Sequence, residues 1–175
     1  EKPAPFKFII HTDTLRAVQF SDFTLKVKVE DKYIRAAKGG TGAAKCAGNY
    51  GGSFYATRIA RQEGYDQGLW SDLSDDLYIE ESGTMNVFFH IGDALITPPL
   101  SDSILEGITR DTVITLAREM GITVEERRIS ALDLQKAHAL GQLHEAFGAG
   151  TAAVTVPIST IGIHNTRIEL PAYTE

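Results

Sequence analysis

Residues 39–52 have the sequence GGTGAAKCAGNYGG, with six glycines around one lysine, Lys45, and a tyrosine, Tyr50, five residues after that lysine. A glycine inside a helix or strand costs about 0.5–1 kcal/mol, so this composition predicts a loop. Glycine-rich loops that contain a lysine bind phosphate groups in several protein classes. A surface loop with a solvated lysine is equally compatible with the composition.

The residues beside Lys45 exclude two known phosphate-binding patterns. A P-loop needs a glycine before its lysine and a serine or threonine after it, and here the neighbours are Ala44 and Cys46. A dinucleotide-binding fingerprint that starts at Gly40 would place Lys45 where its third glycine allows close helix packing. The chemistry of the loop must therefore be inferred from longer motifs.

The histidines and the cysteine do not form a metal-binding pattern. His138 and His144 are six residues apart, which is not the i, i+4 spacing that places two ligands on one helix face. Cys46 is the single cysteine of the sequence, so no second thiol can share a zinc ion with it or form a disulfide within these residues. No metal site is predicted.

The composition limits the classes of partner. The 175 residues can form one domain with a sizeable core, and 43% hydrophobic with 23% charged residues is typical of folded globular proteins. The formal net charge of -6 argues against nucleic acid as a partner, because phosphate backbones bind basic surfaces. No apolar run approaches the roughly 20 residues of a membrane span, and no signal segment opens the sequence. We expect a cytoplasmic protein that acts on small molecules or proteins.

Apolar patterns predict several strands. In residues 24–30 apolar residues alternate with lysines and Glu30, which predicts one buried and one solvated face. Residues 85–99 predict a hairpin with a two-residue turn at positions 92–93. Further strands are expected at residues 6–10, 68–72, 122–129 and 152–161, and a linker or loop at residues 11–23.

Three segments predict helices. Residues 53–64 end in a glycine that can close a helix. Residues 107–121 carry apolar side chains at helical spacing, with Thr109 as the expected N-cap. Residues 130–138 begin with SALD, which is a capping box. The mixed order of strands and helices predicts a sheet-based α/β domain of the mixed α+β kind.

Five longer segments occur in the order RAAKGGTGAAKCAGNYGGS, EESGTMNVFF, TPPLSDSILEGITRDT, VEERRI and EAFGAGTAA. With them the chain resembles the branched-chain amino acid aminotransferases, which are pyridoxal-phosphate enzymes of fold type IV. The resemblance extends from about Lys26 to the end of the sequence. It implies the large-domain pseudobarrel of these enzymes as the fold.

The resemblance implies a catalytic role for Lys45. This residue matches the family's lysine, whose amine forms an imine with the aldehyde of pyridoxal 5'-phosphate. Tyr50 matches the tyrosine that hydrogen-bonds the phenolic oxygen of the cofactor. Glu81 in ESGTMN matches the carboxylate that pairs with the pyridine nitrogen, whereas the adjacent Glu80 matches no such position. The loop glycines are implied to let the backbone approach the cofactor.

The resemblance also implies a phosphate-binding cup. Arg35 in YIRAA matches an arginine that offers its planar guanidinium to phosphate oxygens. Ile108 and Thr109 in GITRD match the start of a helix, where unpaired N–H groups and the helix dipole favour an anion. A third phosphate contact is matched by Thr151 in GAGTAA. The positions on the substrate side are matched by Thr84 and Ala152.

The implied reaction is the transfer of an amino group between leucine, isoleucine or valine and 2-oxoglutarate, in a homodimer or higher homo-oligomer. Because family members are about twice as long, residues 1–20 would be the end of a small N-terminal domain that is mostly absent and the interdomain linker, and residues 21–175 would form most of the large cofactor-binding domain. D-amino acid transaminases and aminodeoxychorismate lyases share the lysine and the glutamate, but GGTGAAKCAGNY and GITRDT fit the branched-chain group better. A fragment that binds phosphate-bearing ligands without catalysis is the other alternative.

Overall fold

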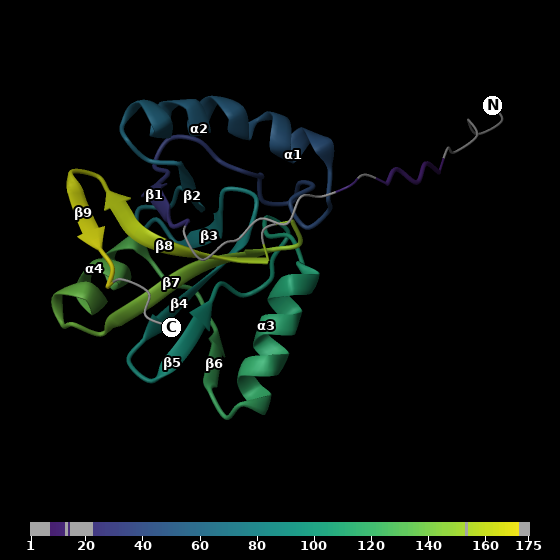
Figure 1. The fold of residues 1–175 in the computed structure, drawn as a ribbon. Coiled ribbons are helices and arrows are strands. Elements are labelled where there is room, and N and C mark those ends of the chain that lie inside the picture. The colour runs from purple at the N-terminus through teal and green to yellow at the C-terminus, as the bar shows by residue number, and fades with distance from the viewer. Residues whose placement is uncertain (1–7, 13, 15–22, 153, 172–175) are drawn as a thin grey trace.

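Nine strands in the described part of the chain form one curled sheet, three of the four described helices pack against it, and the fourth, which is short, contacts another helix (Figure 1). The structure, a computed structural model, describes residues 8–12, 14, 23–152 and 154–171. The strands are β1 (Leu25–Val29), β2 (Gln67–Ser71), β3 (Ile79–Ser82), β4 (Asn86–Ile91), β5 (Ala94–Thr97), β6 (Thr123–Glu126), β7 (Leu143–Gly150), β8 (Val154–Ile163) and β9 (Thr166–Glu169). The helices are α1 (Ala47–Gly51), α2 (Ser53–Gln62), α3 (Ile108–Glu119) and α4 (Ala131–Ala139).

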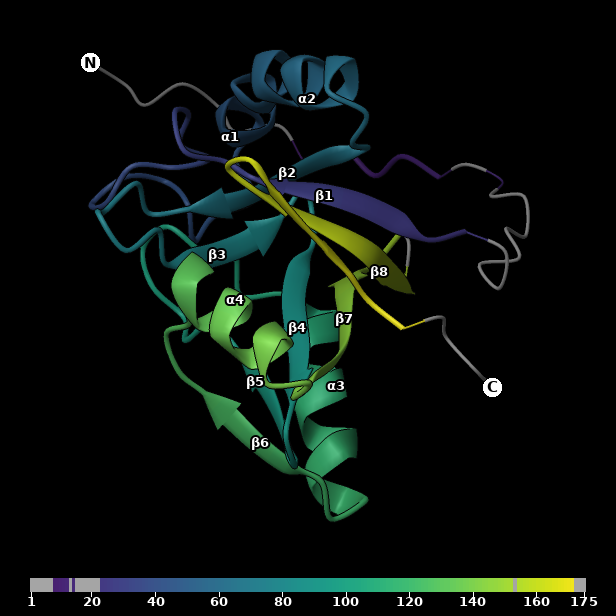
Figure 2. The ribbon, with the colours of Figure 1, turned by 90° about the vertical axis from the view of Figure 1, so that its left-hand side faces the viewer.

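Strand β8 joins the two halves of the sheet, whose order is β3-β2-β1-β8-β7-β4-β5-β6, with β9 also paired to β8. Residues 154–157 of β8 pair antiparallel with β7, and residues 158–162 pair parallel with β1. In Figure 2 strands β1, β2 and β3 cross the upper part of the molecule, whereas β4 and β7 run steeply below them. The two directions curl the sheet into a half-barrel around a core.

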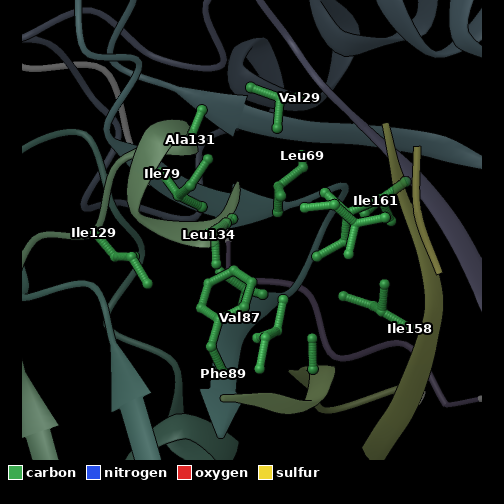
Figure 3. Close-up of a cluster of buried hydrophobic side chains, with 14 of the residues drawn as sticks. Val29, Leu69, Ile79, Val87, Phe89, Ile129, Ala131, Leu134, Ile158 and Ile161 are labelled. Atoms are coloured by element: carbon green, nitrogen blue, oxygen red, sulfur yellow. The ribbon is translucent and has the colours of Figure 1, made fainter. Parts of the chain in front are cut away.

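The main core fills the inside of this curl. Its side chains come from both halves of the sheet and from α4, and Figure 3 shows Val29, Leu69, Val87, Phe89 and Leu134 among them. Each of these five side chains is at most 1% exposed. Because burial of apolar area is the dominant favourable term in folding, this cluster holds the two halves of the sheet and α4 together.

Strand β1 confirms the predicted alternation, with buried apolar residues and an exposed Lys26. The prediction that Glu30 lies on the solvated face is wrong, because this residue is only 6% exposed. The Glu30 carboxylate accepts hydrogen bonds from the backbone N–H groups of Lys32 and Tyr33 at 2.9 and 3.1 Å. These donors offset the cost of burying the carboxylate where the chain turns after the strand.

Strands β4 and β5 form the predicted hairpin, with Gly92 at a φ of 58° in its turn. Two consecutive phenylalanines of β4 point to opposite faces of the sheet. Phe89 lies in the main core, and Phe88 lies in a second core beneath α3, where its ring stacks on Phe147 with 5.1 Å between ring centroids. Full burial of one phenylalanine side chain contributes roughly 1.5–3 kcal/mol. Strand β4 therefore contributes a buried phenylalanine to each of the two cores.

Helices α2 and α4 confirm their predicted ends. The chain leaves α2 through Gly64, whose φ of 87° suits glycine. At the start of α4 the Asp133 N–H donates to the Ser130 hydroxyl at 3.0 Å, and the Ser130 N–H donates to the Asp133 carboxylate at 2.9 Å. Both hydrogen bonds of the predicted capping box are therefore present.

Other sequence-based predictions of the elements were wrong or incomplete. Strands β3, β7 and β9 were not predicted. Residues 8–10 of the strand predicted at 6–10 have no regular structure and are exposed, because no strand in the described part of the chain pairs with them. The remainder of that segment, most of residues 11–23 and most of the predicted domain end at 1–20 lie outside the described residues. Within the described ranges, no helix has the length and apolarity needed to cross a membrane.

Candidate functional site

A pocket of about 500 Å³ lies where the glycine-rich loop, the β3–β4 turn, the start of α3 and the turn after β7 meet. In Figure 1 the upper, amino-terminal end of α3 faces α1. Seven of the nine predicted site residues line this pocket: Lys45, Tyr50, Glu81, Thr84, Thr109, Thr151 and Ala152. The fold thus gathers side chains from four separate segments of the chain.

Lys45 is exposed and lies just before α1. Its Nζ donates a hydrogen bond to Tyr50 Oη at 3.0 Å and lies 4.9 Å from the centre of the tyrosine ring. The short helix α1 makes this contact possible, because it folds the chain back so that residue 50 reaches residue 45. The Lys45 amine therefore lies at the pocket, where the hydrogen bond to the Tyr50 hydroxyl group holds it in place.

The glycine-rich loop packs closely against the segment before α3. A Cβ at Gly42 would lie 2.5 Å from Ser103 Cα, so no other residue fits there without a shift of the backbone. Asp102 binds the loop twice, since its carboxylate accepts from the Gly39 N–H at 2.5 Å and its carbonyl oxygen accepts from the Ala43 N–H at 3.1 Å. The close contact between the glycine-rich loop and the segment before α3 therefore explains why residue 42 is a glycine. The sequence did not predict this contact.

Glu81 is the acidic residue of the pocket and is almost fully buried. Arg35 Nε donates to Glu81 Oε2 at 2.7 Å, and Arg35 Nη2 donates to Glu81 Oε1 at 2.9 Å. The Leu105 N–H donates to the same Oε1 at 2.5 Å. Burial raises the pKa of Glu81 above its ordinary value, although the charge and hydrogen bonds of Arg35 act in the opposite direction.

Two predicted site residues do not line the pocket. Arg35 was predicted to bind phosphate, but its guanidinium contacts Glu81 and, at 3.1 Å, the carbonyl oxygen of Gly42. The role of Arg35 as a phosphate ligand remains a prediction that these contacts do not support.

The side chain of Ile108, the second residue that does not line the pocket, is 82% exposed. Its predicted role involves only the backbone N–H, which lies between the pocket-lining residues Gly107 and Thr109.

Helix α3 begins at Ile108 with Gly107 as its N-cap, so the prediction that Thr109 is the N-cap is wrong. Gly107 takes an extended conformation, with φ of -76° and ψ of 132°, and Thr109 therefore lies inside the first turn. Among the described residues, no side-chain hydrogen bond caps this helix start. The first N–H groups of a helix need partners from outside it, and together with the helix dipole they favour an anion.

The remaining predicted residues lie on turns. Thr84 is exposed in the turn between β3 and β4. Thr151 and Ala152 are exposed in the turn that follows β7. All three line the pocket, so their hydroxyl and backbone groups are accessible from it.

The sequence did not predict six further lining residues, which are Met85, Asn86, Leu105, Gly107, Ala149 and Gly150. Asn86 Nδ2 donates to the Leu105 carbonyl oxygen at 2.9 Å, which ties β4 to the segment before α3. A Cβ at Gly107 would lie 2.1 Å from Asn86 Oδ1, so glycine leaves room for this amide. A polar residue at the start of the apolar run NVFF was the signal that could have indicated Asn86.

Metal ligation finds no support in the residues that the structure describes, where no group of three or more histidine, cysteine, aspartate or glutamate side chains is arranged to hold an ion. The pocket instead combines an amine, a hydroxyl group, a buried carboxylate and an uncapped helix start. Such a set can hold a molecule that has an aldehyde, a basic nitrogen and an anionic group.

Comparison with known families identifies the source of this arrangement. The family described as amino-transferase class IV matches residues 7–161. The chain belongs to the class IV aminotransferases.

Curated relatives of this class IV aminotransferase chain are similar over most of its length. It is 49% identical over 144 residues to branched-chain-amino-acid transaminase 1 of Bacillus subtilis, a match that covers 82% of this chain and 40% of the relative. It is 47% identical over 141 residues to a branched-chain-amino-acid aminotransferase of Mycobacterium tuberculosis, which covers 78% of this chain and 38% of that protein. The chain thus spans about 40% of the length of these relatives.

Solved structures confirm the fold of this aminotransferase chain. The branched-chain aminotransferase of Thermoproteus uzoniensis with norvaline matches with a TM-score of 0.71 and 33% identity, over 86% of this chain and 47% of that one. The enzyme of Thermobaculum terrenum in its PLP-form matches with a TM-score of 0.70 and 36% identity, over 83% of this chain and 46% of that one. The half-barrel is therefore the fold expected for fold type IV.

Proposed function

We propose that this chain takes part in the transfer of an amino group between branched-chain L-amino acids and 2-oxoglutarate, with pyridoxal 5'-phosphate as cofactor. One observation carries the proposal: a single pocket is lined by the Lys45 amine, the Glu81 carboxylate and the uncapped start of α3. These groups suit an aldehyde, a protonated ring nitrogen and a phosphate, respectively. The names of the curated relatives support the class of substrate.

The pocket fits this cofactor in size and in chemistry. A volume of about 500 Å³ falls within the usual range of small-molecule sites. Gly107 and Gly150 lie in its wall, where an added Cβ would lie 2.1 Å from Asn86 Oδ1 and 3.0 Å from Met85 Cγ, so glycine lets these lining side chains keep their places. When bound, pyridoxal phosphate supplies an electron-withdrawing ring that stabilises negative charge at the substrate Cα.

Lys45 would carry out two tasks. Its amine would hold the cofactor in the pocket through an imine bond to the aldehyde carbon, with the aldehyde oxygen leaving as water. When it is not bonded to the cofactor, the Lys45 amine would take up the proton of the substrate Cα and return it. Tyr50 Oη, 3.0 Å from Nζ, holds the amine in place and would donate to the phenolic oxygen.

The start of α3 and the turn after β7 would bind the anionic groups. The Ile108 N–H and the hydroxyl groups of Thr109 and Thr151 would contact the phosphate, since the uncapped helix start provides unpaired donors. The Ala152 N–H would receive the substrate carboxylate, and Thr84 would line the substrate side. Ala152 and Thr84 are exposed and accessible to a substrate that enters the pocket.

The proposal extends to the whole protein. Because this chain spans about 40% of its curated relatives, we propose that it is a partial catalytic unit, with residues 21–175 as most of the large domain and residues 1–20 as the end of a small domain and the interdomain linker. A cytoplasmic location and a homodimer or higher homo-oligomer complete the proposal. They rest on the composition and on the family resemblance.

The experiment that tests the proposal is covalent labelling of the cofactor site. Pyridoxal phosphate is added, the visible absorbance is recorded, and borohydride then fixes the label before peptide mapping. We expect a yellow adduct on Lys45 that Lys45→Ala abolishes. Lys38→Ala is the matched control, because Lys38 is an exposed lysine that does not line the pocket. A label spread over surface lysines would refute the proposal.

A substrate panel then separates the related reactions. Conversion of the bound cofactor to its amino form by leucine, isoleucine or valine supports the branched-chain assignment. Conversion by D-alanine instead would favour a D-amino acid transaminase, and release of pyruvate from aminodeoxychorismate would favour a lyase. Labelling of Lys45 without any conversion would favour a cofactor-binding fragment.

A further inference from the structure

We infer that Arg35 is a positioning residue, which favours the ionised form of Glu81 and fixes the orientation of its carboxylate at the pocket wall. The inference rests on the proposed function only for the task that Glu81 then performs, which is to pair with a protonated ring nitrogen. The pairing of the two residues follows from the contacts of the described part of the chain.

Arg35 binds Glu81 through two parallel hydrogen bonds. Nε donates to Oε2 at 2.7 Å and Nη2 donates to Oε1 at 2.9 Å, and the two side chains are only 7% and 4% exposed. Two-pronged pairs of arginine and carboxylate are among the stronger and more directional hydrogen-bonded ion pairs, and the ammonium group of lysine cannot form them. Arg35 therefore fixes the plane of the Glu81 carboxylate as well as its charge.

The glycine-rich loop holds Arg35 in turn. Nη2 also donates to the Gly42 carbonyl oxygen at 3.1 Å. Gly42 packs against Ser103 so closely that a Cβ would lie 2.5 Å from Ser103 Cα. Two residues further on, the Leu105 N–H donates to Glu81 Oε1 at 2.5 Å. The loop and the segment before α3 therefore enclose the ion pair from two sides.

Glu81 keeps capacity for one more partner. A carboxylate offers about four acceptor positions, and Arg35 and Leu105 occupy three of them. Since Glu81 lines the pocket, the remaining position can serve an N–H donor bound there. An ionised carboxylate stabilises a protonated ring nitrogen, whereas a neutral carboxylic acid does not.

The surroundings of Glu81 make a cation necessary. Burial raises the pKa of Glu81, and the adjacent Glu80 raises it further because like charges repel. The other titratable groups that line the pocket are Lys45 and Tyr50, which bond to each other. Without Arg35 the buried carboxylate would lose the cation that is bonded to it, and its neutral form would be favoured.

The first test uses the protein without cofactor. The pKa of Glu81 is measured by carboxyl ¹³C NMR titration, with the signal assigned through Glu81→Gln. We expect Arg35→Gln to raise this pKa by at least about one unit, since a carboxylate beside an arginine is typically lowered by 1–3 units. Arg35→Lys should raise it less. Arg58→Gln, which removes an exposed arginine of α2, is the control and should leave it unchanged. An unchanged Glu81 pKa in Arg35→Gln would overturn the inference.

A double variant covers the case in which Arg35→Gln does not fold. If charge compensation is the role of Arg35, Arg35→Gln combined with Glu81→Gln restores folding, because no buried charge is then left without a partner. If the double variant is also unfolded, Arg35 acts independently of Glu81 and the inference is refuted.

Ligand binding separates this role from phosphate binding. Affinities for pyridoxal phosphate and for pyridoxal are compared in the wild type and in Arg35→Gln. A positioning role predicts the same fold-loss for both compounds, whereas a phosphate ligand would affect pyridoxal phosphate alone, and that result would overturn the inference. If the wild type binds neither compound, the proposed function fails, and the NMR titration still decides the role of Arg35.

Discussion

Lys45 Nζ lies 3.0 Å from Tyr50 Oη, and both side chains line the same pocket. The contact spans five residues and depends on α1, which begins two residues after Lys45. A lysine in an ordinary surface loop has no such fixed partner, because its long side chain loses entropy when it is held in one position. The hydroxyl group of Tyr50 therefore orients the amine before any ligand binds.

Tyr50→Phe tests this orientation. We expect the chain to fold normally and to form the adduct at Lys45, with an affinity for pyridoxal phosphate that is roughly 2- to 10-fold lower, since a typical hydrogen bond contributes about 0.5–1.5 kcal/mol. Absorbance titration measures the affinity. Tyr55→Phe changes an exposed tyrosine of α2 outside the pocket and serves as the control. Equal affinities for Tyr50→Phe and the wild type would show that the hydroxyl group has no role in binding.

Gly42→Ala should disturb the contact between the glycine-rich loop and Ser103. The added Cβ would lie 2.5 Å from Ser103 Cα, and forced overpacking of this kind costs about 1–3 kcal/mol. We expect a lower midpoint of urea denaturation and weaker binding of pyridoxal phosphate, because the same loop carries Lys45. Gly51→Ala, at a position in α1 with open space around it, should be neutral or stabilising. Similar midpoints for the two variants would contradict the packing role of Gly42.

Local signals explain what the sequence could predict. The capping box at Ser130, the hairpin turn at Gly92 and the helix end at Gly64 each depend on a few adjacent residues, and all three are confirmed. The pocket residues Lys45 and Glu81 were found through long motifs, and no local pattern alone would have indicated that they share one pocket.

Contacts between distant segments explain what the sequence could not predict. Strand β3 has the sequence IEES, which reads as polar, yet all four residues are buried. Glu81 can be buried there because Arg35, 46 residues away, bonds to it. Strand β7 is rich in alanine and glycine, which favour strands weakly; Met85 fills the space beside Gly148 and Gly150. Such partners are known only once the sheet is assembled.

Ser130→Ala should remove half of the capping box of α4. Loss of an N-cap serine costs about 0.5–2 kcal/mol, and α4 contributes the buried Leu134 to the main core. We therefore expect a lower free energy of unfolding, measured by urea denaturation with circular dichroism. Ser130→Asp restores an N-cap acceptor and should recover most of the loss. A stability for Ser130→Ala equal to that of the wild type would mean that the cap does not limit α4.

Glu80→Gln should reduce the pH dependence of stability. Burial raises the pKa of Glu80 by more than its hydrogen bond from Ser103 lowers it, and Glu80 Oε2 has no partner within the described structure. A carboxyl group with a raised pKa binds more protons in the folded state, so the free energy of unfolding falls as pH rises through the folded pKa. We expect a smaller fall in Glu80→Gln than in the wild type between about pH 4 and pH 8.

Urea denaturation across this range measures the effect of Glu80. The pKa of Glu81 is also raised by burial, so part of the fall should persist in Glu80→Gln. Glu106→Gln, at an exposed position, is the control and should follow the wild type. If the free energy of unfolding of Glu80→Gln falls with rising pH as steeply as that of Glu106→Gln, the role assigned to the buried Glu80 carboxyl is wrong.

Exposure of the pocket predicts that residues 1–175 alone catalyse poorly. Lys45, Thr84 and Thr151 are all exposed, so water reaches the groups that would hold the cofactor and substrate. Positioning and exclusion of water supply much of the rate of an enzyme, and a misplacement of about 1 Å can cost roughly 100-fold. We therefore expect the chain to bind pyridoxal phosphate at Lys45 but to transfer the amino group of leucine to 2-oxoglutarate at least roughly 100-fold more slowly than Bacillus subtilis transaminase 1. Glutamate formation at matched concentrations of cofactor-loaded protein measures both rates. Comparable rates would show that residues 1–175 already form a complete catalytic unit and that catalysis does not need further exclusion of water from the pocket.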